Sequence, residues 1–387
     1  MTPLAQRASD WLATRRAEME DMLQRIVDID SGSRDGAGID AVGDIMAAML
    51  ETDGIAVTRF PNETYGAVLK ADIPGNIPGN GGGAPVLVMG HRDTVYPKGT
   101  VAARPFTRDG DTARGPGVAD MKGGLVVDVF VLRALKAAGG TGFPLIGLFT
   151  ADEEIGSPSG RKIIEEVARG ARAAFNAEPG RVSGNVVTAR KGGLTLDITV
   201  TGRAAHSGVN HADGASAIGA LAAKITALHA LTDYPSGITT NVGVIRGGRT
   251  HNTVADHAEA ALDIRFRSVE QLDGILARVE AILAAEDVPG TSASYQRGHL
   301  FMPLEEQHSA DLFARYKAAA AEVGFEVDGE FTGGCADSGF TGALGVPSLC
   351  GLGPVGGAAH TEREWCRLET LVPRAQALAV TIAGLEG

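Results

Sequence analysis

The sequence predicts an α/β protein in which a smaller α+β domain is inserted into a larger domain built around a mixed sheet. Short, nearly continuous apolar runs at 86–89 and 145–149 flank a helical pattern, which is typical of strands buried on both faces of an α/β sheet. Around residue 190 apolar and polar residues begin to alternate, as they do in a strand with one solvated face. After about residue 298 the first pattern resumes, which indicates that the second domain is an insertion.

The large domain begins with helical patterns. Apolar residues recur at helical spacing over 4–29 and 38–51, and again over 125–135 between the two buried strands. A segment rich in Gly, Pro and Asn at 74–83 leads directly into the first buried strand, so we interpret it as a hairpin or exposed loop. The last strand and helix of this domain are expected at 346–350 and 371–382.

The inserted domain has the order strand, helix, strand, strand, helix, strand, which is the ferredoxin-like pattern. Its six elements are expected near 194–200, 213–231, 241–247, 258–266, 268–285 and 291–297. We therefore assign residues 1–188 and 298–387 to the large domain and residues 189–297 to the inserted domain.

Composition and charge narrow the class of protein. With 387 residues and 44% hydrophobic content, the chain is long enough for two domains with full cores. The net charge of −12 argues against a nucleic-acid or anionic-membrane partner, because either would need a basic surface. Three cysteines without paired spacing predict neither a disulfide framework nor a zinc ribbon. The N-terminal region has no long apolar stretch, so we expect a cytoplasmic enzyme, with a periplasmic one as the alternative.

A histidine and an aspartate follow the first buried strand. His91 and Asp93 lie at its carboxyl end, where open α/β sheets bind their ligands. On an extended segment both side chains point the same way, so Asp93 can accept a hydrogen bond from one imidazole nitrogen while the other nitrogen binds a metal. Taken alone, such a histidine is more often structural or solvent-facing.

Four further segments each present a histidine or carboxylates. Asp120 lies in a glycine-rich turn that enters a helix, where an ordinary N-cap is the alternative. The acidic run 152–154 follows the second buried strand, and its carboxylates would repel one another unless cations or water neutralise them. A solvated acidic loop is the alternative there. Glu178 closes the next apolar segment, and His360 follows a strand and a glycine-rich loop.

Together these five segments predict a metal centre. Each is expected at a strand end of the large domain, and the inserted domain has no equivalent set. Two histidines and three carboxylates are the nitrogen and oxygen donors that suit zinc, with one carboxylate shared between two ions. Such a pair, about 3.5 to 4 Å apart, activates a water and polarises a carbonyl together. A spare carboxylate beside the pair would serve as general base.

These residues resemble metallopeptidase family M20, the zinc-dependent aminoacylases and carboxypeptidases, and within it the glutamate carboxypeptidase branch. The resemblance implies a zinc-exopeptidase-like catalytic domain with an inserted lid and dimerisation domain. Six motifs carry it, in the family's order across nearly the whole chain: His91-Arg-Asp93-Thr-Val-Tyr-Pro-Lys-Gly99, Gly115-Pro-Gly-Val-Ala-Asp120-Met-Lys-Gly-Gly124, Asp152-Glu153-Glu154-Ile-Gly156, Glu178-Pro179, Gly202-Arg-Ala-Ala-His206-Ser-Gly208 and Thr332-Gly-Gly-Cys-Ala-Asp337.

The resemblance implies a separate role for each residue of the metal centre. Glu153 would be the general base, which takes a proton from the attacking water and delivers it to the leaving amine. Asp93 would orient His91. The family often has a cis peptide bond after the bridging aspartate, here Asp120-Met121. The five ligands would be divided between two zinc ions, with His91 and Glu178 on one, Glu154 and His360 on the other, and Asp120 between them.

The inserted domain would act as a lid and as the contact of a homodimer. His206 would reach the partner's active site to stabilise the oxyanion, and an exposed histidine without such a role is the alternative. Asn252 and Arg265 match positions that grip the substrate's carboxylate, with plain solvation of Arg265 as the alternative. The pocket loop would contribute Thr332, Gly334 and Cys335.

The pocket loop departs from the family pattern. In the glutamate branch it usually reads Arg-Thr-Gly-Gly-Gly, whereas here Phe331 and Cys335 replace the Arg and the last Gly. The departure argues against a strict glutamate preference. Our hypothesis is that Phe331 favours an apolar or aromatic neighbour in the substrate.

The resemblance implies a two-zinc hydrolase that cleaves the amide bond of a C-terminal amino acid in a small peptide or N-acyl amino acid. Cobalt and manganese are the alternative metals. An N-acyl-amino-acid deacylase, a desuccinylase or a dipeptidase of the same family is the nearest alternative activity. A metal-free descendant that only binds a ligand is the remote alternative.

Overall fold

The computed structural model describes residues 1–76 and 83–386. Most of the loop expected at 74–83 therefore lies outside the described residues. The chain divides into two compact units. The first is formed by Met1–Arg190, Leu304–Thr332 and Ala336–Gly387, and the second by Lys191–Pro303 with Gly333–Cys335.

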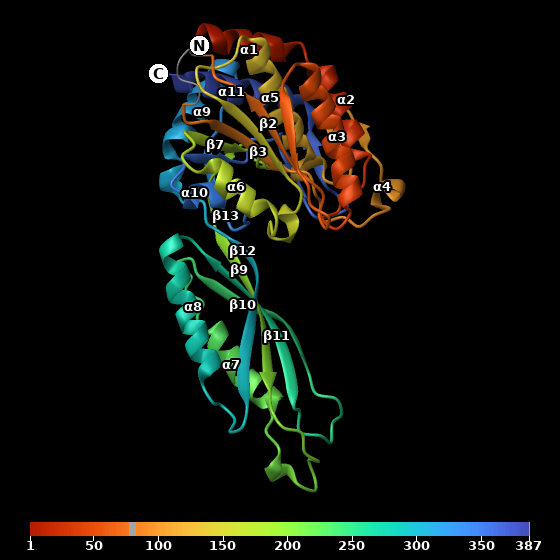
Figure 1. Ribbon diagram of the computed structural model, residues 1–387, viewed down its shortest axis with the longest axis vertical. Helices are drawn as coiled ribbons and strands as arrows, with labels where there is room; N and C mark the ends of the chain where they lie inside the picture. The colour runs from red at the N-terminus through yellow and green to blue at the C-terminus, as the bar shows by residue number, and fades with distance from the viewer. Residues whose placement is uncertain (77–82, 387) are drawn as a thin grey trace. The chain divides into compact units, whose positions relative to one another are not determined.

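An eight-stranded sheet forms the middle of the first unit (Figure 1). Every residue of β3, β6 and β7 is buried, which explains the unbroken apolar runs and agrees with a sheet covered on both faces. The neighbours β6, β3, β7 and β14 are parallel, so their carboxyl ends meet at one edge. The strand order is β1 (Ala56–Phe60), β2 (Val68–Ile73), β6 (Leu145–Thr150), β3 (Val86–His91), β7 (Ala173–Asn176), β14 (Ser348–Cys350), β8 (Val186–Arg190) and β13 (Gly329–Thr332).

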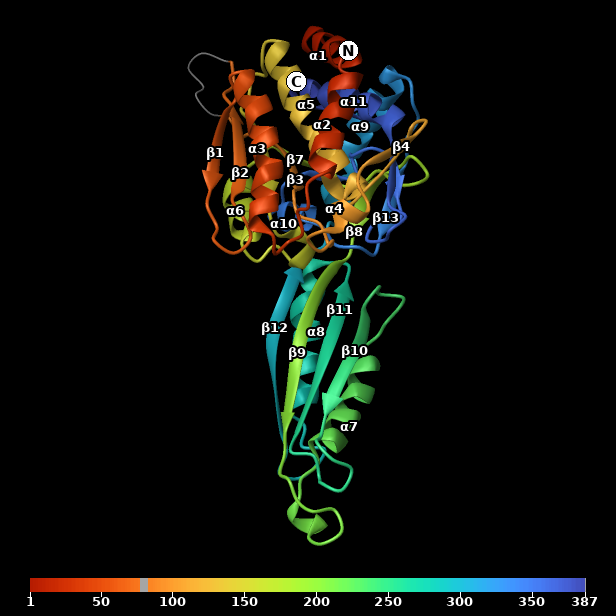
Figure 2. The same cartoon turned by 90° about the vertical axis from the view of Figure 1, so that its right-hand side faces the viewer.

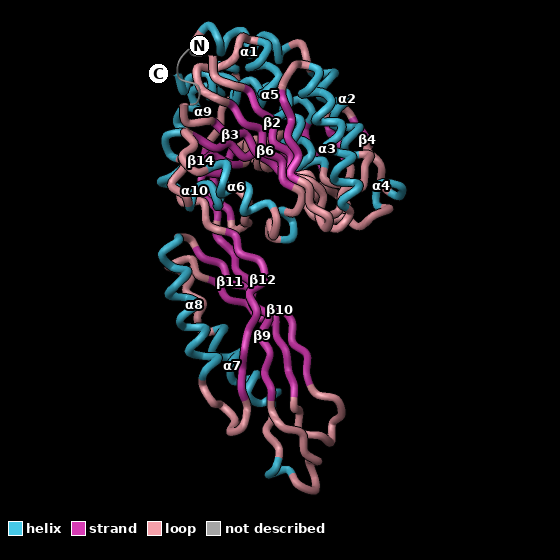
Figure 3. The backbone as a smooth tube through the Cα atoms, viewed as in Figure 1, coloured by secondary structure: helices cyan, strands magenta, loops and turns pink. Residues whose placement is uncertain are grey.

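Helices pack around this sheet (Figure 3). The most buried of the longer ones is α5, which contacts α1, α2, α3 and α11 as well as β3 and β6. The helices of the first unit are α1 (Pro3–Ala13), α2 (Arg16–Val27), α3 (Gly36–Thr52), α4 (Thr100–Ala103), α5 (Gly124–Ala137), α6 (Gly160–Ala168), α9 (Ala310–Val323), α10 (Ser338–Ala343) and α11 (Leu371–Ala383).

The helical pattern over 4–29 is formed by two helices, because the chain breaks between α1 and α2. The Thr14 hydroxyl donates to the carbonyl oxygen of Trp11 at 3.1 Å, and the backbone N–H of Arg15 donates to that of Leu12 at 2.9 Å. These local bonds end the helix. The apolar spacing continues across the break, so periodicity alone does not reveal it.

A second sheet of the first unit is absent from the sequence prediction. Its order is β15 (Gly356–Gly357), β16 (Trp365–Arg367), β5 (Thr112–Arg114) and β4 (Thr107–Asp109), and all its pairs are antiparallel. Strands of two or three residues are too short to carry a readable alternation. Their importance is positional, because they join segments that are distant in the sequence.

The second unit has the predicted ferredoxin-like order. Its sheet runs β10, β11, β9, β12, and both helices pack on one face of it (Figure 2). The burial of β9 alternates along the strand, as expected when the other face is solvated. The elements are β9 (Gly192–Thr201), α7 (Ala217–His229), β10 (Thr239–Gly247), β11 (His257–Phe266), α8 (Val269–Ala284) and β12 (Ser292–Phe301).

Within the described residues, none of the helices combines the length and the apolar content that crossing a membrane would require.

Candidate metal centre

Three predicted ligands and the predicted base follow adjacent parallel strands. His91 is the last residue of β3, Glu153 and Glu154 lie in the turn after β6, and Glu178 lies two residues beyond β7. Since β3 pairs with β6 on one side and with β7 on the other, the sheet brings these side chains to one edge. The side chains of His91, Glu154 and Glu178 are 1%, 6% and 6% exposed.

Asp120 reaches the same edge by a route that differs from the prediction. It does not follow a strand of the large sheet but lies in the turn Val118–Gly123 at the start of α5. A Cβ on Gly124 would come within 1.8 Å of the carbonyl oxygen of Ala177, so only glycine lets this turn lie against the segment after β7. The Asp120-Met121 peptide bond is cis, as the resemblance implies.

The small sheet places His360 beside Asp120. His360 lies in the loop between β15 and β16, and β16 pairs with β5, the strand that precedes the Asp120 turn. Its φ angle is 64°, a left-handed conformation that few non-glycine residues adopt. Its side chain is 52% exposed, so this histidine is on the solvent-accessible side of the centre.

The five predicted ligands form two groups that share Asp120. In the first group, Nε2 of His91 lies 3.2 Å from Oδ1 of Asp120 and 3.7 Å from Oε1 of Glu178. In the second group, Nε2 of His360 lies 3.3 Å from Oδ2 of Asp120 and 3.1 Å from Oε2 of Glu154. Within each group, the ligand atoms all lie within 4.8 Å of one another. Each oxygen of Asp120 thus faces a different histidine, as expected of a carboxylate between two cations.

The electrostatics of the centre fit bound cations. Burial raises the pKa of Glu154 to about 7 and also raises that of Glu178. Burial alone would raise the pKa of Asp120, whereas hydrogen bonds from His360 and His91 hold it below its usual range. Among the described residues, Oε1 of Glu154 and Oε1 of Glu178 are buried without a hydrogen-bond partner. Such oxygens are costly unless a cation meets them, so the donor set fits a pair of zinc ions.

The three carboxylates of the acidic run lie in three different environments. Asp152 accepts hydrogen bonds from the backbone N–H groups of Ser159 and Gly160, at 2.6 and 3.1 Å, and so holds the start of α6. Glu154 belongs to the second ligand group. Glu153 lies outside both groups, with Oε2 3.9 Å from Nε2 of His91, and burial raises its pKa well above the usual range. A buried carboxylate beside the ligands, with a raised pKa, can act as a general base.

Asp93 connects His91 to the acidic run. Its carboxylate accepts hydrogen bonds from the backbone N–H groups of Glu153 at 3.0 Å and Glu154 at 3.1 Å, and from the Ser33 hydroxyl at 2.7 Å. Nδ1 of His91 lies 3.0 Å from the carbonyl oxygen of Asp93 and 3.3 Å from its Oδ1. Both acceptors leave Nε2 of His91 free to face Asp120.

Glu364 is a residue of the centre that the sequence analysis missed. Its side chain is buried, and it accepts hydrogen bonds from the backbone N–H groups of Gly117, Ala119 and Asp120 at 3.1, 2.9 and 2.9 Å. The Tyr96 hydroxyl donates to it at 2.7 Å. Glu364 therefore fixes the turn that carries Asp120. Nothing in the sequence distinguishes it from exposed acidic neighbours.

The comparison with protein families decides the assignment. The model of peptidase family M20/M25/M40 matches residues 87–384, which is more than half of the chain and spans every predicted ligand. The chain belongs to this peptidase family.

Relatives of this M20 protein include carboxypeptidase G2 from Pseudomonas sp. strain RS-16, which is 30% identical over 348 residues, covering 88% of this chain and 82% of the relative. A succinyl-diaminopimelate desuccinylase from Cupriavidus taiwanensis is 30% identical over 313 residues, covering 74% and 79%. The structure is similar to that of aminopeptidase PepT from Bacillus cereus, with a TM-score of 0.78, 21% identity and coverage of 96% and 99%.

These findings confirm the predicted family, the predicted fold class and the prediction of an enzyme of the metallo-carboxypeptidase and amidohydrolase class.

The second unit of this M20 protein does not bring its predicted substrate residues together. Asn252 lies beside His206, since the backbone N–H of Ser207 donates to the Asn252 carbonyl oxygen at 3.0 Å, and this pair precedes β11. Arg265 lies near the other end of β11, which at about 3.3 Å per residue is roughly 25 Å away. There its guanidinium donates to Asp263 at 2.9 Å and to Sγ of Cys335 at 2.8 Å.

The remaining pocket-loop residues are divided between the two units. Thr332 is the last residue of β13 in the first unit, whereas Gly334 and Cys335 group with the second. Phe331, also on β13, is 45% exposed.

Proposed function

We propose that this M20 protein is a two-zinc hydrolase that cleaves the amide bond next to a free carboxylate, in a small peptide or an N-acyl amino acid. One observation carries the proposal: two ligand groups share Asp120, and Glu153 lies beside them but outside both. Cobalt and manganese take similar donors and are the alternatives to zinc.

In the proposed reaction, different buried side chains hold the metals, transfer the proton and position the base. When bound, the metal pair supplies Lewis acidity and lowers the pKa of the attacking water. Glu153 accepts the proton of that water and delivers it to the leaving nitrogen. Asp93 accepts hydrogen bonds from the backbone N–H groups of Glu153 and Glu154. These bonds fix the position of the base relative to the ligand beside it.

We further propose that the working enzyme is a homodimer formed through the second unit. In the single chain Asn252 and His206 lie far along β11 from Arg265, so one unit does not supply all three groups to one substrate. A second copy can supply the missing pair. Edge strand β10 carries exposed Val244 and Ile245, 49% and 54% exposed, and such an edge is suited to contact with another chain. His206 of the partner subunit would then stabilise the oxyanion.

The substrate class follows from the relatives and from the pocket loop. Carboxypeptidase G2 and a desuccinylase both match most of the chain, so carboxypeptidase and deacylase activities are the two candidates. We place carboxypeptidase first because carboxypeptidase G2 is the relative that this chain covers more fully. Phe331 and Cys335 argue against a strict preference for glutamate as the released amino acid.

The decisive experiment compares metal content and turnover in three proteins: the wild type, Glu153→Gln and the exposed control Glu166→Gln. We expect two zinc ions per chain in all three, and a fall in kcat of about 10² to 10⁴-fold in Glu153→Gln only. Chelation should abolish turnover in the wild type, and added zinc should restore it. Unchanged turnover in Glu153→Gln, or a wild type that binds no divalent metal, would contradict the proposal.

A further inference from the structure

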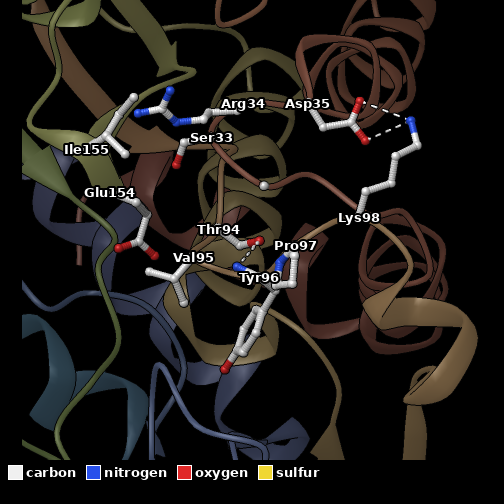
Figure 4. Close-up of a pocket in the computed structure, with 11 residues that line it drawn as sticks. Ser33, Arg34, Asp35, Thr94, Val95, Tyr96, Pro97, Lys98, Glu154 and Ile155 are labelled. Carbon is white, nitrogen blue, oxygen red and sulfur yellow. Dashed lines mark hydrogen bonds and ion pairs between the residues drawn. The ribbon is translucent and has the colours of Figure 1, made fainter.

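A cavity of about 520 Å³ in the first unit opens beside Glu154. Two loops line it, at 32–35 and 94–98, together with Ile155 (Figure 4). Glu154 also belongs to the second ligand group, so the cavity begins at the candidate metal centre itself. A substrate whose carbonyl lies at that centre would therefore extend into this cavity.

The cavity has apolar walls and, among the described residues, one exposed cationic side chain that forms no ion pair. Val95, which is 41% exposed, and Ile155 form part of its walls. Lys98 is neutralised locally, because its Nζ lies 3.1 Å from Oδ2 of Asp35. Over residues 1–76 and 83–386, Arg34 forms no ion pair with any acidic side chain, and Figure 4 shows its guanidinium extended toward Ile155 and away from Asp35.

A second cavity beside the centre, of about 260 Å³, differs from the first in the ion pairs of its arginines. It is lined by Asp120, Glu178 and two arginines, but both arginines have acidic neighbours. Nη2 of Arg190 lies 3.9 Å from Glu178, and Nε of Arg181 lies 3.5 Å from Glu330. Of the two cavities, the one at Arg34 is therefore the one with a cation available to a ligand.

We propose that the larger cavity binds the acyl side of the substrate, and that Arg34 selects acyl groups that end in a carboxylate. This inference rests on the proposed function and deepens it. The apolar walls accommodate a methylene chain, and the guanidinium pairs with the terminal anion in the planar geometry that Arg and carboxylate share. The same chemistry occurs in a dicarboxylic acyl group, such as succinyl or glutaryl, and in an N-terminal γ-glutamyl residue.

The test uses substrates with one common released amino acid and different acyl groups: butanoyl, succinyl, pentanoyl, glutaryl and γ-glutamyl. We expect kcat/KM to be about tenfold higher for succinyl than for butanoyl and for glutaryl than for pentanoyl, as a charged hydrogen bond implies. Arg34→Gln should reduce this preference to within about twofold, and Arg34→Lys should keep part of it. Arg169→Gln, which removes an exposed arginine that does not line the cavity, should leave it unchanged. The glutaryl and γ-glutamyl arms show whether a free α-amino group is accepted.

A binding measurement separates this proposal from the proposed function. Calorimetry on the zinc-loaded protein should show glutarate binding about tenfold more tightly than pentanoate, with the difference lost in Arg34→Gln. Arg34-dependent glutarate binding without hydrolysis of any acyl substrate would support the cavity and contradict the proposed function. Hydrolysis with no preference for the dicarboxylic groups, and no effect of Arg34→Gln, would overturn the cavity while leaving the proposed function intact.

Discussion

The candidate metal centre and the predicted substrate residues of the second unit are built in opposite ways. His91, Glu154 and Glu178 are almost completely buried, and buried carboxylates and backbone groups fix the segments that carry them. In the second unit, His206 and Asn252 are exposed and lie far along β11 from Arg265. The contrast indicates that the candidate metal centre is preorganised, whereas the residues of the second unit predicted to bind substrate are open to solvent and far apart.

The largest expected effect concerns the residue that both ligand groups share. Asp120→Asn should lose affinity for both metals, since the amide carries no charge to balance two cations. We expect less than one zinc per chain and a loss of kcat of at least about 10⁴-fold, because both metal and base contributions depend on this residue. Mass spectrometry of the native protein measures the zinc content, and steady-state kinetics measure kcat. Two retained ions would show that Asp120 is not the bridge.

Glu364 tests whether preorganisation of the centre depends on groups outside the ligand set. In the wild type, both carboxylate oxygens of Glu364 accept hydrogen bonds from N–H or O–H donors. In Glu364→Gln an amide NH₂ replaces one of these oxygens and cannot accept them, so the Asp120 turn should become more mobile. Zinc affinity should fall by about 10 to 100-fold. Competition with a chromogenic chelator measures this affinity, and the exposed neighbour Glu362→Gln is the matched control. Equal affinities in the two variants would contradict a positioning role.

His206 tests the other side of the comparison. His206→Ala should keep its zinc and its KM but lose about 10²-fold in kcat, the loss expected when one oxyanion donor is removed. If this residue acts across a dimer, mixing His206→Ala with Asp120→Asn and allowing subunit exchange should recover about a quarter of the wild-type activity, because half of the dimers then hold one complete site. Absence of recovery in a mixture shown to form mixed dimers would place His206 outside the partner's site.

The smallest expected effect is on side-chain preference. Phe331→Arg restores the residue that the glutamate branch usually has, so it should raise kcat/KM for N-acyl-glutamate relative to N-acyl-phenylalanine by about threefold to tenfold. Tyr234→Arg, a similar change at an exposed aromatic residue of the second unit, is the control. If the ratio of the two kcat/KM values is the same in the wild type and in Phe331→Arg, the hypothesis that residue 331 contributes to side-chain preference is wrong.

The sequence predicts the parts of the centre that follow long, buried strands. The strands before the Asp93 and Glu153 segments are buried at every position and carry short apolar runs, so the strand ends and the polar residues that follow can be located from the sequence. The meeting of Asp120 with His360 cannot be located in this way, because strands of two or three residues bring it about. The helix break at Thr14 is hidden for a related reason, since local hydrogen bonds rather than apolar spacing decide it.

For the second unit, the sequence predicts the elements but not the distances between their residues. Alternation along β9 and β11 predicts its strands and helices in the correct order. It does not reveal that Asn252, which precedes β11, is separated from Arg265 by most of the length of that strand, because strand length enters only when the elements are placed in space. Residues proposed to act on one substrate from two chains share no local pattern that a single sequence could display.

The pairing of β5 with β16 has a consequence for how the enzyme is made. His360 is the last of the five candidate ligands in sequence order, and the strand that holds it beside Asp120 is formed by residues 365–367. During synthesis the N-terminal end of a chain leaves the ribosome first. Both ligand groups therefore wait for residues 360–364 to be synthesised, because Glu364 fixes the turn that carries Asp120 and His360 completes the second group. A chain that stops before these residues would lack one candidate ligand and the carboxylate that positions the shared one, although the strands that carry His91, Glu154 and Glu178 would already have been made.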